Sequence, residues 1–345
     1  MHRIAVVTGG STPERDVAIA GAGQVVKALR DRGFAVSVVD TAAGELAGEA
    51  EREFLSVTVG RDPPPPETLE RLAEQELGPR LADLPSIRHS DVVFIVLHGH
   101  QGEGGSIQAV FDLAGVCYAG SGPIGSGVAM DKDLAKRLIR AAGIPTPDWL
   151  MWPARRAEVE KLGLPLIVKP SKVGSSVGLS VVRDPAGLEA AVATAAGFDD
   201  EILLERYVDG RELTVGILAG KPLGVGEIIP SHETFDYECK YTPGACEEIF
   251  PARIDPKLAR KVQELALATH VALKLRDFSR IDFRVDADEA PYCLEANTLP
   301  GLTVTSLLPQ SALCVGLGFA ELCESICRSA YDRAKCGEQT EGHKG

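Results

Sequence analysis

Short apolar runs alternate with amphipathic segments through the first 120 residues. Apolar runs that predict buried strands lie at 2–7, 34–40, 92–97 and 116–120. Three segments have helical spacing. The first begins in the turn 9–17 and ends at about residue 32, and the others lie at 67–83 and 106–114. A proline run at 62–66 precludes a helix there and predicts an extended linker. Strands that alternate with helices in this way indicate an α/β domain built on a parallel sheet.

The rest of the chain predicts short strands and helices in a less regular, α+β order. Predicted strands lie at 164–169, 178–182, 201–208, 214–220, 279–285 and 291–297. Predicted helices lie at 131–143, 186–196, 256–274 and 318–334, and 228–250 is irregular. We therefore expect an N-terminal α/β domain (1–120), a central part (121–216), a C-terminal part (217–335) and a polar tail (336–345).

Composition and charge narrow the classes of partner. Lys and Arg number 36 against 49 Asp and Glu, a formal charge of −13, so the basic surface of a nucleic-acid binder is not expected. The N-terminus has no signal-peptide pattern, and no stretch approaches about 20 uninterrupted apolar residues. We expect a cytoplasmic protein with small-molecule substrates and no membrane partner. The eight cysteines include no C-x-x-C pair and are predicted to be structural thiols.

The segments 279–285 and 291–297 are predicted to form a β-hairpin centred between residues 288 and 289. This register places Asp282 opposite Glu295 and Arg280 opposite Asn297, with all four side chains on one face. The other face, expected in the core, collects Ile281, Phe283, Val285, Tyr292, Leu294 and Ala296. Carboxylate and amide oxygens suit Mg²⁺ or Mn²⁺ shared with phosphate oxygens. A salt-bridged sheet surface without a ligand is the alternative interpretation.

Four other stretches place glycines or polar residues where a ligand could bind. The glycine-rich loop 169–178 lies between two strands and suits phosphates, unless it is only a flexible surface hairpin. Residues 205–208 could offer backbone groups to an adenine, although an ordinary strand end has the same pattern. The turns 9–14 and 98–106 follow parallel strands, where open α/β sheets bind ligands. The first of these turns lacks G-x-G-x-x-G spacing, and it favours a small charged ligand over a dinucleotide.

Together and in this order, these stretches resemble the ATP-grasp superfamily and, more narrowly, the D-alanine–D-alanine ligase family. The similarity is carried by GGSTPERDV, LHGHQGEGGSIQ, MDK, IVKPSKVGSSVG, LLERYVDGREL, DYECKY, SRIDF and LEANTLPGLTVTSLLP. It extends from Arg3 to about Glu324, nearly the whole chain. The resemblance implies a three-domain ATP-grasp architecture and a homodimer. It also implies ligation of two D-alanines through an acyl phosphate, with ATP and two Mg²⁺ or Mn²⁺ ions, for peptidoglycan precursors.

The resemblance implies roles for individual residues as well. Lys132 and Lys169 would contact the ATP phosphates, with Lys240 near the γ-phosphate. Glu205, Arg206, Tyr207 and Val208 would line the adenine pocket, and Glu212 would hold the ribose. Asp282, Glu295 and Asn297 would bind the metal ions. The first amino acid would lie near His98, with its ammonium at Glu14 in a hydrogen-bonded set with Ser175 and Tyr241. The second would bind at Ser306 and the amide of Leu307, while Arg280 and the backbone of Gly301 would stabilise the oxyanion.

Three positions depart from the family pattern, Gly104, Ala18 and Cys239, and none of them removes a predicted ligand. The resemblance also implies that a chain with Lys240 and Tyr241 takes an amino acid as its second substrate, since relatives that use D-lactate carry a different loop at these positions. Two other functions stay open. One is an ATP-grasp ligase with another acceptor, such as D-serine or a biosynthetic amine. The other is a nucleotide-binding protein without catalysis, which the intact set of predicted phosphate and metal ligands disfavours.

Overall fold

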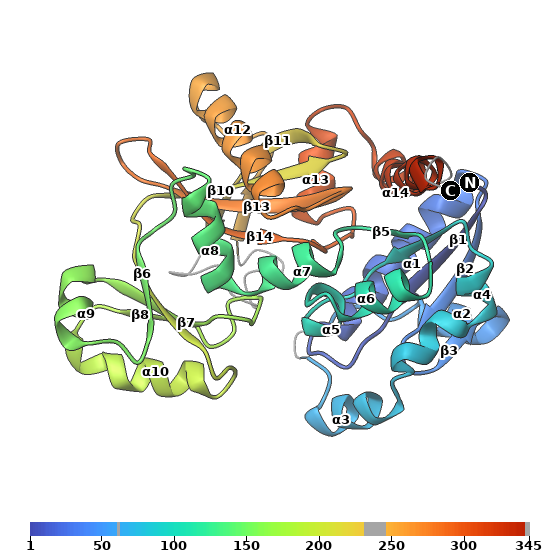
Figure 1. The fold of residues 1–345 in the computed structure, drawn as a ribbon, viewed down its shortest axis with the longest axis horizontal. Helices are drawn as coiled ribbons and strands as arrows, with labels where there is room; N and C mark the ends of the chain where they lie inside the picture. The colour runs from blue at the N-terminus through green and yellow to red at the C-terminus, as the bar shows by residue number, and fades with distance from the viewer. Residues whose placement is uncertain (61–62, 231–245, 342–345) are drawn as a thin grey trace.

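The computed structural model describes residues 1–60, 63–230 and 246–341. Within these residues the chain forms three β-sheets, called sheets A, B and C in chain order (Figure 1). Sheet A is mostly parallel, whereas sheets B and C are antiparallel. The predicted order, an α/β domain followed by α+β parts, is therefore confirmed.

Sheet A has the strand order β3-β2-β1-β4-β5, in which only β2 and β3 pair antiparallel. Its strands are β1 (Arg3–Thr8), β2 (Ala35–Asp40), β3 (Gly44–Leu46), β4 (Val92–Ile95) and β5 (Tyr118–Ala119). Its helices are α1 (Arg15–Asp31), α2 (Gly48–Phe54), α3 (Pro66–Gln75), α4 (Pro85–Arg88), α5 (His100–Glu103) and α6 (Ser106–Leu113), with a 3-10 helix at Gly78–Asp83. The predicted linker is shorter than expected, because its last residue, Pro66, begins α3. Proline is tolerated at the first position of a helix, since the backbone N–H that it lacks would have no partner within the helix there.

The centre of sheet A is a topological switch point. From β1 the chain proceeds to β2 on one side, and β4 lies on the other side. Ligands of open α/β sheets bind at such points, beyond the carboxyl ends of the strands. The turn after β1 leads to Glu14 and the turn after β4 carries His98, so two of the predicted ligand-binding stretches lie at this edge.

Sheet B is a four-stranded antiparallel sheet with the order β6-β9-β7-β8. Its strands are β6 (Trp149–Trp152), β7 (Leu166–Pro170), β8 (Ser180–Val182) and β9 (Ile202–Arg206). Helices α9 (Arg156–Leu162) and α10 (Leu188–Ala196) and a 3-10 helix at Pro185–Gly187 complete this part. The apolar face of β7, with Leu166 and Val168, packs on α10 in a small core. This packing fixes β7 and β8, and the glycine-rich loop connects them.

Sheet C has the order β12-β11-β10-β13-β14. Its strands are β10 (Arg211–Leu218), β11 (Lys221–Pro230), β12 (Cys246–Ile249), β13 (Phe278–Val285) and β14 (Pro291–Asn297). Helices α7 (Pro123–Met130), α8 (Lys132–Ala141), α12 (Pro256–Ala272) and α13 (Leu307–Leu313) pack around it. Val215, Ile281 and Phe283 share a buried core with Val262 of α12. Because side chains alternate along β13, Arg280 and Asp282 project from the opposite face.

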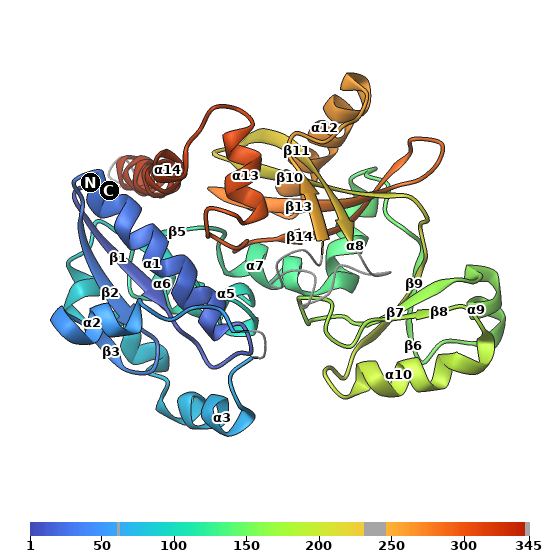
Figure 2. The ribbon, with the colours of Figure 1, turned by 180° about the vertical axis from the view of Figure 1, so that it is seen from behind.

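The last helix, α14 (Phe319–Glu341), returns to the N-terminal part and packs against α1, β4 and β5 (Figures 1 and 2). Its Leu322, Cys323, Ile326 and Cys327 are fully buried in the core of sheet A. Helix α8 also packs outside its predicted part, since its Ala135 belongs to the core of sheet C. The boundaries near 120, 216 and 335 stay a prediction, and these two helices pack across them.

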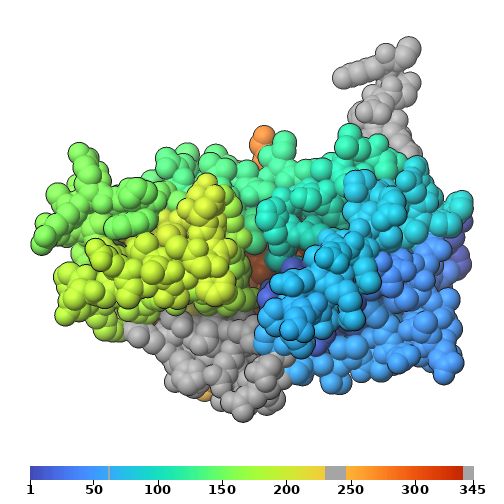
Figure 3. Space-filling model, turned by 90° about the horizontal axis from the view of Figure 1, so that it is seen from below, coloured from blue at the N-terminus to red at the C-terminus, as the bar shows by residue number. Residues whose placement is uncertain are grey.

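The three parts of the chain meet around a hollow. Figure 3 shows the N-terminal part in blue and the sheet B part in yellow-green on either side of this hollow, with a patch of the C-terminal third between them. No helix in the described ranges is long and apolar enough to cross a membrane. None of the cysteines that the structure describes forms a disulfide.

Candidate active site

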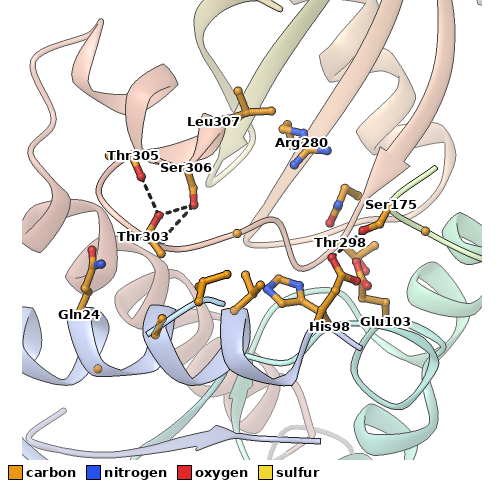
Figure 4. Close-up of a pocket in the computed structure, with 18 of the residues that line it drawn as sticks. Gln24, His98, Glu103, Ser175, Arg280, Thr298, Thr303, Thr305, Ser306 and Leu307 are labelled. Carbon is orange, nitrogen blue, oxygen red and sulfur yellow. Dashed lines mark hydrogen bonds between the residues drawn. The ribbon is translucent and has the colours of Figure 1, made fainter. Parts of the chain in front are cut away.

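A cavity of about 660 Å³ lies where the three sheets meet, and we call it the larger cavity. Its lining includes Glu14 after β1, His98 after β4, Ser175 of the glycine-rich loop, Arg280 of β13 and Ser306 before α13. In Figure 4, His98, Ser175 and Arg280 lie around one open space. Segments that are far apart in the sequence therefore converge on one site.

A second cavity, the smaller cavity, has a volume of about 130 Å³ and lies between sheets B and C. It is lined by residues with predicted phosphate, adenosine or metal contacts: Lys132, Lys169, Glu205, Arg206, Tyr207, Val208, Glu212, Asp282 and Glu295. Apolar side chains, among them Ile167 and Leu294, complete its wall. Lys132, Arg280 and Glu295 line both cavities, so the cavities adjoin at the β13–β14 face.

The β13–β14 hairpin has the predicted pairing at the end that lies away from its turn. Asp282 pairs with Glu295 and Arg280 pairs with Asn297. The predicted core face is wrong at two positions, because a β-bulge shifts the register after Asp282 and pairs Phe283 with Cys293. The extra residue reverses the faces of β14, so Cys293 is fully buried while Tyr292 and Leu294 are only half-buried. Leu294 thus contributes to the smaller cavity instead of the core.

Charged groups on this face are paired with one another. Arg280 Nη2 donates to Asp282 Oδ2 at 2.8 Å, and Thr214 Oγ1 donates to Asp282 Oδ1 at 2.6 Å. Burial opposes the charge of Arg280, but Asp282 and Glu295 outweigh it and raise the pKa of Arg280. Lys132 Nζ lies 3.5 Å from Glu295 Oε2. Arg280 therefore stays cationic where the two cavities adjoin.

The predicted metal ligands are two carboxylates and one amide on this same face. Asn297 Oδ1 accepts a hydrogen bond from the Leu299 amide at 3.2 Å, which fixes the orientation of the side-chain amide. Among the residues that the structure describes, no group of three or more His, Cys, Asp or Glu side chains is placed to hold a metal by itself. Oxygen donors of this number fit Mg²⁺ that takes its remaining ligands from phosphates, as is usual for this ion.

A buried lysine–glutamate cluster lies under the smaller cavity. Lys169 Nζ donates to Glu205 Oε2 at 2.7 Å, and Lys136 donates to the other oxygen of that carboxylate. Lys136 is fully buried and also donates to Thr146 Oγ1 at 2.6 Å. Burial alone would raise the pKa of Glu205, but the two ammonium groups lower it. Sequence reasoning did not include Lys136, although its spacing of four from Lys132 on a helix was a usable signal.

The glycine-rich loop contacts the turn after β1. Ser175 Oγ donates to Glu14 Oε1 at 2.6 Å and so joins sheet B to sheet A across the larger cavity. Ser175 and Ser176 both have φ of 56°, a left-handed conformation that is uncommon for serine. Lys132 Nζ donates to the carbonyl of Val173 in the same loop at 2.9 Å. These contacts place the loop over the junction of the two cavities.

Glu103 is a second residue that sequence reasoning did not select. It lies in the wall of the larger cavity beside His98 and accepts a hydrogen bond from the Gly99 amide at 2.8 Å (Figure 4). Burial and the neighbouring Glu14 raise the pKa of Glu103 to about 8, although Arg280 opposes this shift. Its carboxyl group is therefore protonated in much of the population near neutral pH.

A turn before α13 forms the remaining wall of the larger cavity. Ser306 Oγ accepts from the Thr303 amide at 3.1 Å and lies 2.8 Å from Thr303 Oγ1, as the dashed lines in Figure 4 mark. Leu307 is the first residue of α13, so its amide belongs to the unbonded first turn. A Cβ added at Gly301 would come within 2.9 Å of Ser306 Oγ, so only glycine fits without a shift.

The remaining predicted site residues, Lys240 and Tyr241, lie outside the described residues, as does Cys239. The other predicted phosphate, adenosine, metal and substrate residues lie in the walls of the two cavities.

Family models match both halves of the chain. The model described as "D-ala D-ala ligase N-terminus" matches residues 3–121, and the model described as "D-ala D-ala ligase C-terminus" matches residues 138–328. The D-alanine–D-alanine ligase of Geobacter sulfurreducens is 39% identical over 339 residues, which cover 96% of this chain and 95% of the relative. The ligase of Synechococcus sp. (strain JA-3-3Ab) is 37% identical over 337 residues, with 96% and 94% covered.

Solved structures agree with this similarity. The D-alanine–D-alanine ligase from Bacillus anthracis aligns with a TM-score of 0.77 and 31% identity, over 97% of this chain and 99% of that one. Its complex with ATP aligns with a TM-score of 0.75 at 28% identity, over 97% and 99% of the two chains. The VanG D-Ala:D-Ser ligase from Enterococcus faecalis aligns with a TM-score of 0.78 and 28% identity, over 96% and 99%.

Proposed function

The chain belongs to the D-alanine–D-alanine ligase family, and we propose that the larger cavity binds its two D-alanines and the smaller cavity its ATP. It is an ATP-dependent ligase that joins two D-alanines to D-alanyl-D-alanine for peptidoglycan precursors. The assignment of ATP to one cavity and D-alanine to the other rests on the fact that the two cavities adjoin. Lys132, Arg280 and Glu295 line both, so a phosphoryl donor and a carboxylate acceptor would meet there.

Activation of the first D-alanine explains the cations at this junction. A carboxylate is a poor electrophile, so it must first be activated. Its oxygen would attack the γ-phosphorus of ATP, the bond from that phosphorus to the bridging oxygen would break, and an acyl phosphate and ADP would result. Lys132 and Lys169 would offset the charge of the phosphates during this transfer. Asp282, Glu295 and Asn297 would hold Mg²⁺ or Mn²⁺, which supplies further charge neutralisation when bound. The resemblance adds Lys240 near the γ-phosphate.

Two sets of residues would orient the amino acids. Glu14, whose carboxylate is fixed by the hydrogen bond from Ser175, would accept a hydrogen bond from the ammonium of the first D-alanine near His98. Tyr241 would belong to the same hydrogen-bonded network. Ser306 and the Leu307 amide would hold the carboxylate of the second. Its amine, in the neutral form, would then attack the acyl carbon. The bond from that carbon to the phosphate oxygen would break, phosphate would leave, and the nitrogen would lose one proton to solvent to give the peptide bond.

Negative charge develops on the acyl oxygen during this attack. Arg280 and the Gly301 backbone would stabilise it, since Arg280 stays cationic at the junction of the cavities. The glycine-rich loop, fixed by the contact between Ser175 and Glu14, would exclude water that could hydrolyse the acyl phosphate.

The proposal is tested by phosphate release from ATP and Mg²⁺ with D-alanine, L-alanine, D-serine or D-lactate, with mass spectrometry of the products. Release that depends on D-alanine, with the mass of D-alanyl-D-alanine, is expected. Turnover only with a different acceptor would retain the ATP and metal assignments and overturn the acceptor assignment. No turnover despite ATP binding would overturn the catalytic assignment.

We also propose a homodimer, because relatives of the family are commonly dimers. Sedimentation of the full chain is expected to give twice the monomer mass of 36.6 kDa. A monomer at micromolar concentration would refute this part of the proposal.

A further inference from the structure

One arginine in the smaller cavity has no role in the mechanism above. Arg284 lies on β13, on the same face as Arg280 and Asp282, and lines the smaller cavity. The antiparallel pairing of β10 with β13 places it directly opposite Glu212. Directly opposite residues of neighbouring strands have side chains on one face and within reach of each other.

The guanidinium of Arg284 contacts three of the residues expected around adenosine. Its Nη1 lies 3.4 Å from Glu212 Oε2, and its Nε donates to the carbonyl of Val208 at 3.2 Å. Its central carbon lies 5.8 Å from the centre of the Tyr207 ring. The side chains of Arg284 and Glu212 are each 15% exposed, so the pair lies largely out of solvent.

The family resemblance places the ribose at Glu212, and the arrangement around this carboxylate suits the hydroxyl groups of a sugar. An ionised carboxylate accepts hydrogen bonds, and a hydroxyl group donates one, so a fixed carboxylate selects a ribose that carries hydroxyls. A carboxylate that is little exposed needs a partner to stay ionised and in one orientation. Arg284 supplies one such partner, and its contact with Val208 fixes the guanidinium in turn.

We propose that Arg284 is a positioning residue that gives the smaller cavity its selectivity for the ribose hydroxyls of the nucleotide, acting through Glu212. The inference rests on the proposed function to the extent that it places ATP in this cavity. A guanidinium that only attracted the phosphates would strengthen the binding of every nucleoside triphosphate equally. The proposed role of Arg284 instead predicts a difference between nucleotides with and without ribose hydroxyls.

The test compares ATP with 2′-deoxy-ATP and 3′-deoxy-ATP in the wild type and in Arg284→Met. The wild type is expected to prefer ATP over at least one deoxynucleotide by about tenfold or more in KM, because a hydrogen bond to a charged group is lost. Arg284→Met should raise KM for ATP and bring this preference close to one, while the KM for D-alanine stays within about twofold. Arg284→Lys, which restores the charge, should recover part of the preference.

Arg183→Met is the matched control. The guanidinium carbon of Arg183 lies 5.9 Å from the same Tyr207 ring, but Arg183 lines a separate cavity beside β8 and α10. This variant should keep the wild-type preference for ATP over the deoxynucleotides. Equal use of ATP and both deoxynucleotides by the wild type would overturn the inference, as would an equal rise in KM for all three nucleotides in Arg284→Met.

Calorimetric binding of the same three nucleotides with Mg²⁺ separates this inference from the proposed function. If the wild type binds ATP but forms no dipeptide, the catalytic assignment fails while the ribose preference can still be measured. If the wild type makes dipeptide but binds the three nucleotides equally, only the role of Arg284 fails.

Discussion

Replacement of Lys136 by methionine removes one of the two cations that neutralise the buried carboxylate of Glu205. The side chain of Lys136 is fully buried and that of Glu205 is 3% exposed, so solvent cannot replace the lost ammonium. Breaking a buried pair in this way costs about 3–5 kcal/mol. Lys169 still pairs with Glu205 at 2.7 Å, and methionine keeps the aliphatic contacts. We therefore expect the free energy of unfolding to fall by about 3 kcal/mol at pH 7.5, the lower end of that range.

The pH dependence of this loss follows from the sign of the pKa shift. In the wild type the two lysines lower the pKa of Glu205, so its contribution to stability is present above the unfolded pKa of about 4.3 and is lost as pH falls through the folded pKa. In Lys136→Met the pKa of Glu205 rises, since burial raises it and one opposing cation is gone. The difference between the two proteins should thus be largest near pH 7.5 and shrink toward about pH 4.5.

Urea unfolding at several pH values measures this difference. Lys27→Met is the matched control, because Lys27 forms an exposed ion pair with Asp31 and its loss should change the free energy of unfolding by less than about 0.5 kcal/mol. A loss below about 1 kcal/mol in Lys136→Met, or a loss that does not vary with pH, would show that Lys136 does not neutralise Glu205.

Three further predictions concern the walls of the two cavities. Glu295→Gln should abolish ADP formation with little change in the thermal unfolding temperature; near wild-type turnover would remove the metal assignment. Ser175→Ala should raise the KM for D-alanine roughly tenfold, because Glu14 loses a hydrogen bond to a charged group, whereas an unchanged KM in the same titration would contradict the role of that contact. Glu103 has a pKa raised to about 8, so its contribution to stability should fall as pH rises from about 4.5 to 8 while the buried carboxyl ionises. Glu103→Gln should therefore gain about 2 kcal/mol or more in the free energy of unfolding at pH 8 and little at pH 5, and equal gains at both would refute it.

The site could be predicted from the sequence where chemistry and local register coincide. Alternation along two adjacent strands was enough to place Arg280, Asp282, Glu295 and Asn297 on one face, and the structure has these pairs. The bulge could not be predicted, because one extra residue changes no local propensity and leaves the apolar character of Leu294 consistent with either face. Its effect is confined to the part of β14 that lies toward the turn.

Residues that act through burial were harder to find. Lys136 looks in the sequence like one more charged residue on an amphipathic helix. Only the packing of α8 against β14 and α12, and its hydrogen bond to Glu205 of β9, show that it is enclosed. Glu103 stands in a glycine-rich turn with no periodicity to place it. Arg284 gains its meaning from Glu212, which is distant in sequence and becomes its neighbour only in sheet C. Such contacts depend on topology, which local patterns do not encode.

The return of α14 to sheet A has a consequence for the order in which the protein can fold during synthesis. The strands of sheet A are made first, yet Leu322, Cys323 and Ile326, which complete its core, are made only after sheets B and C. Until then the nascent sheet exposes the apolar surface that α14 later covers, a surface on which other chains can aggregate. Sheet A therefore leaves the ribosome before sheets B and C, yet its core is completed after them, so its maturation depends on synthesis of the later parts of the ligase.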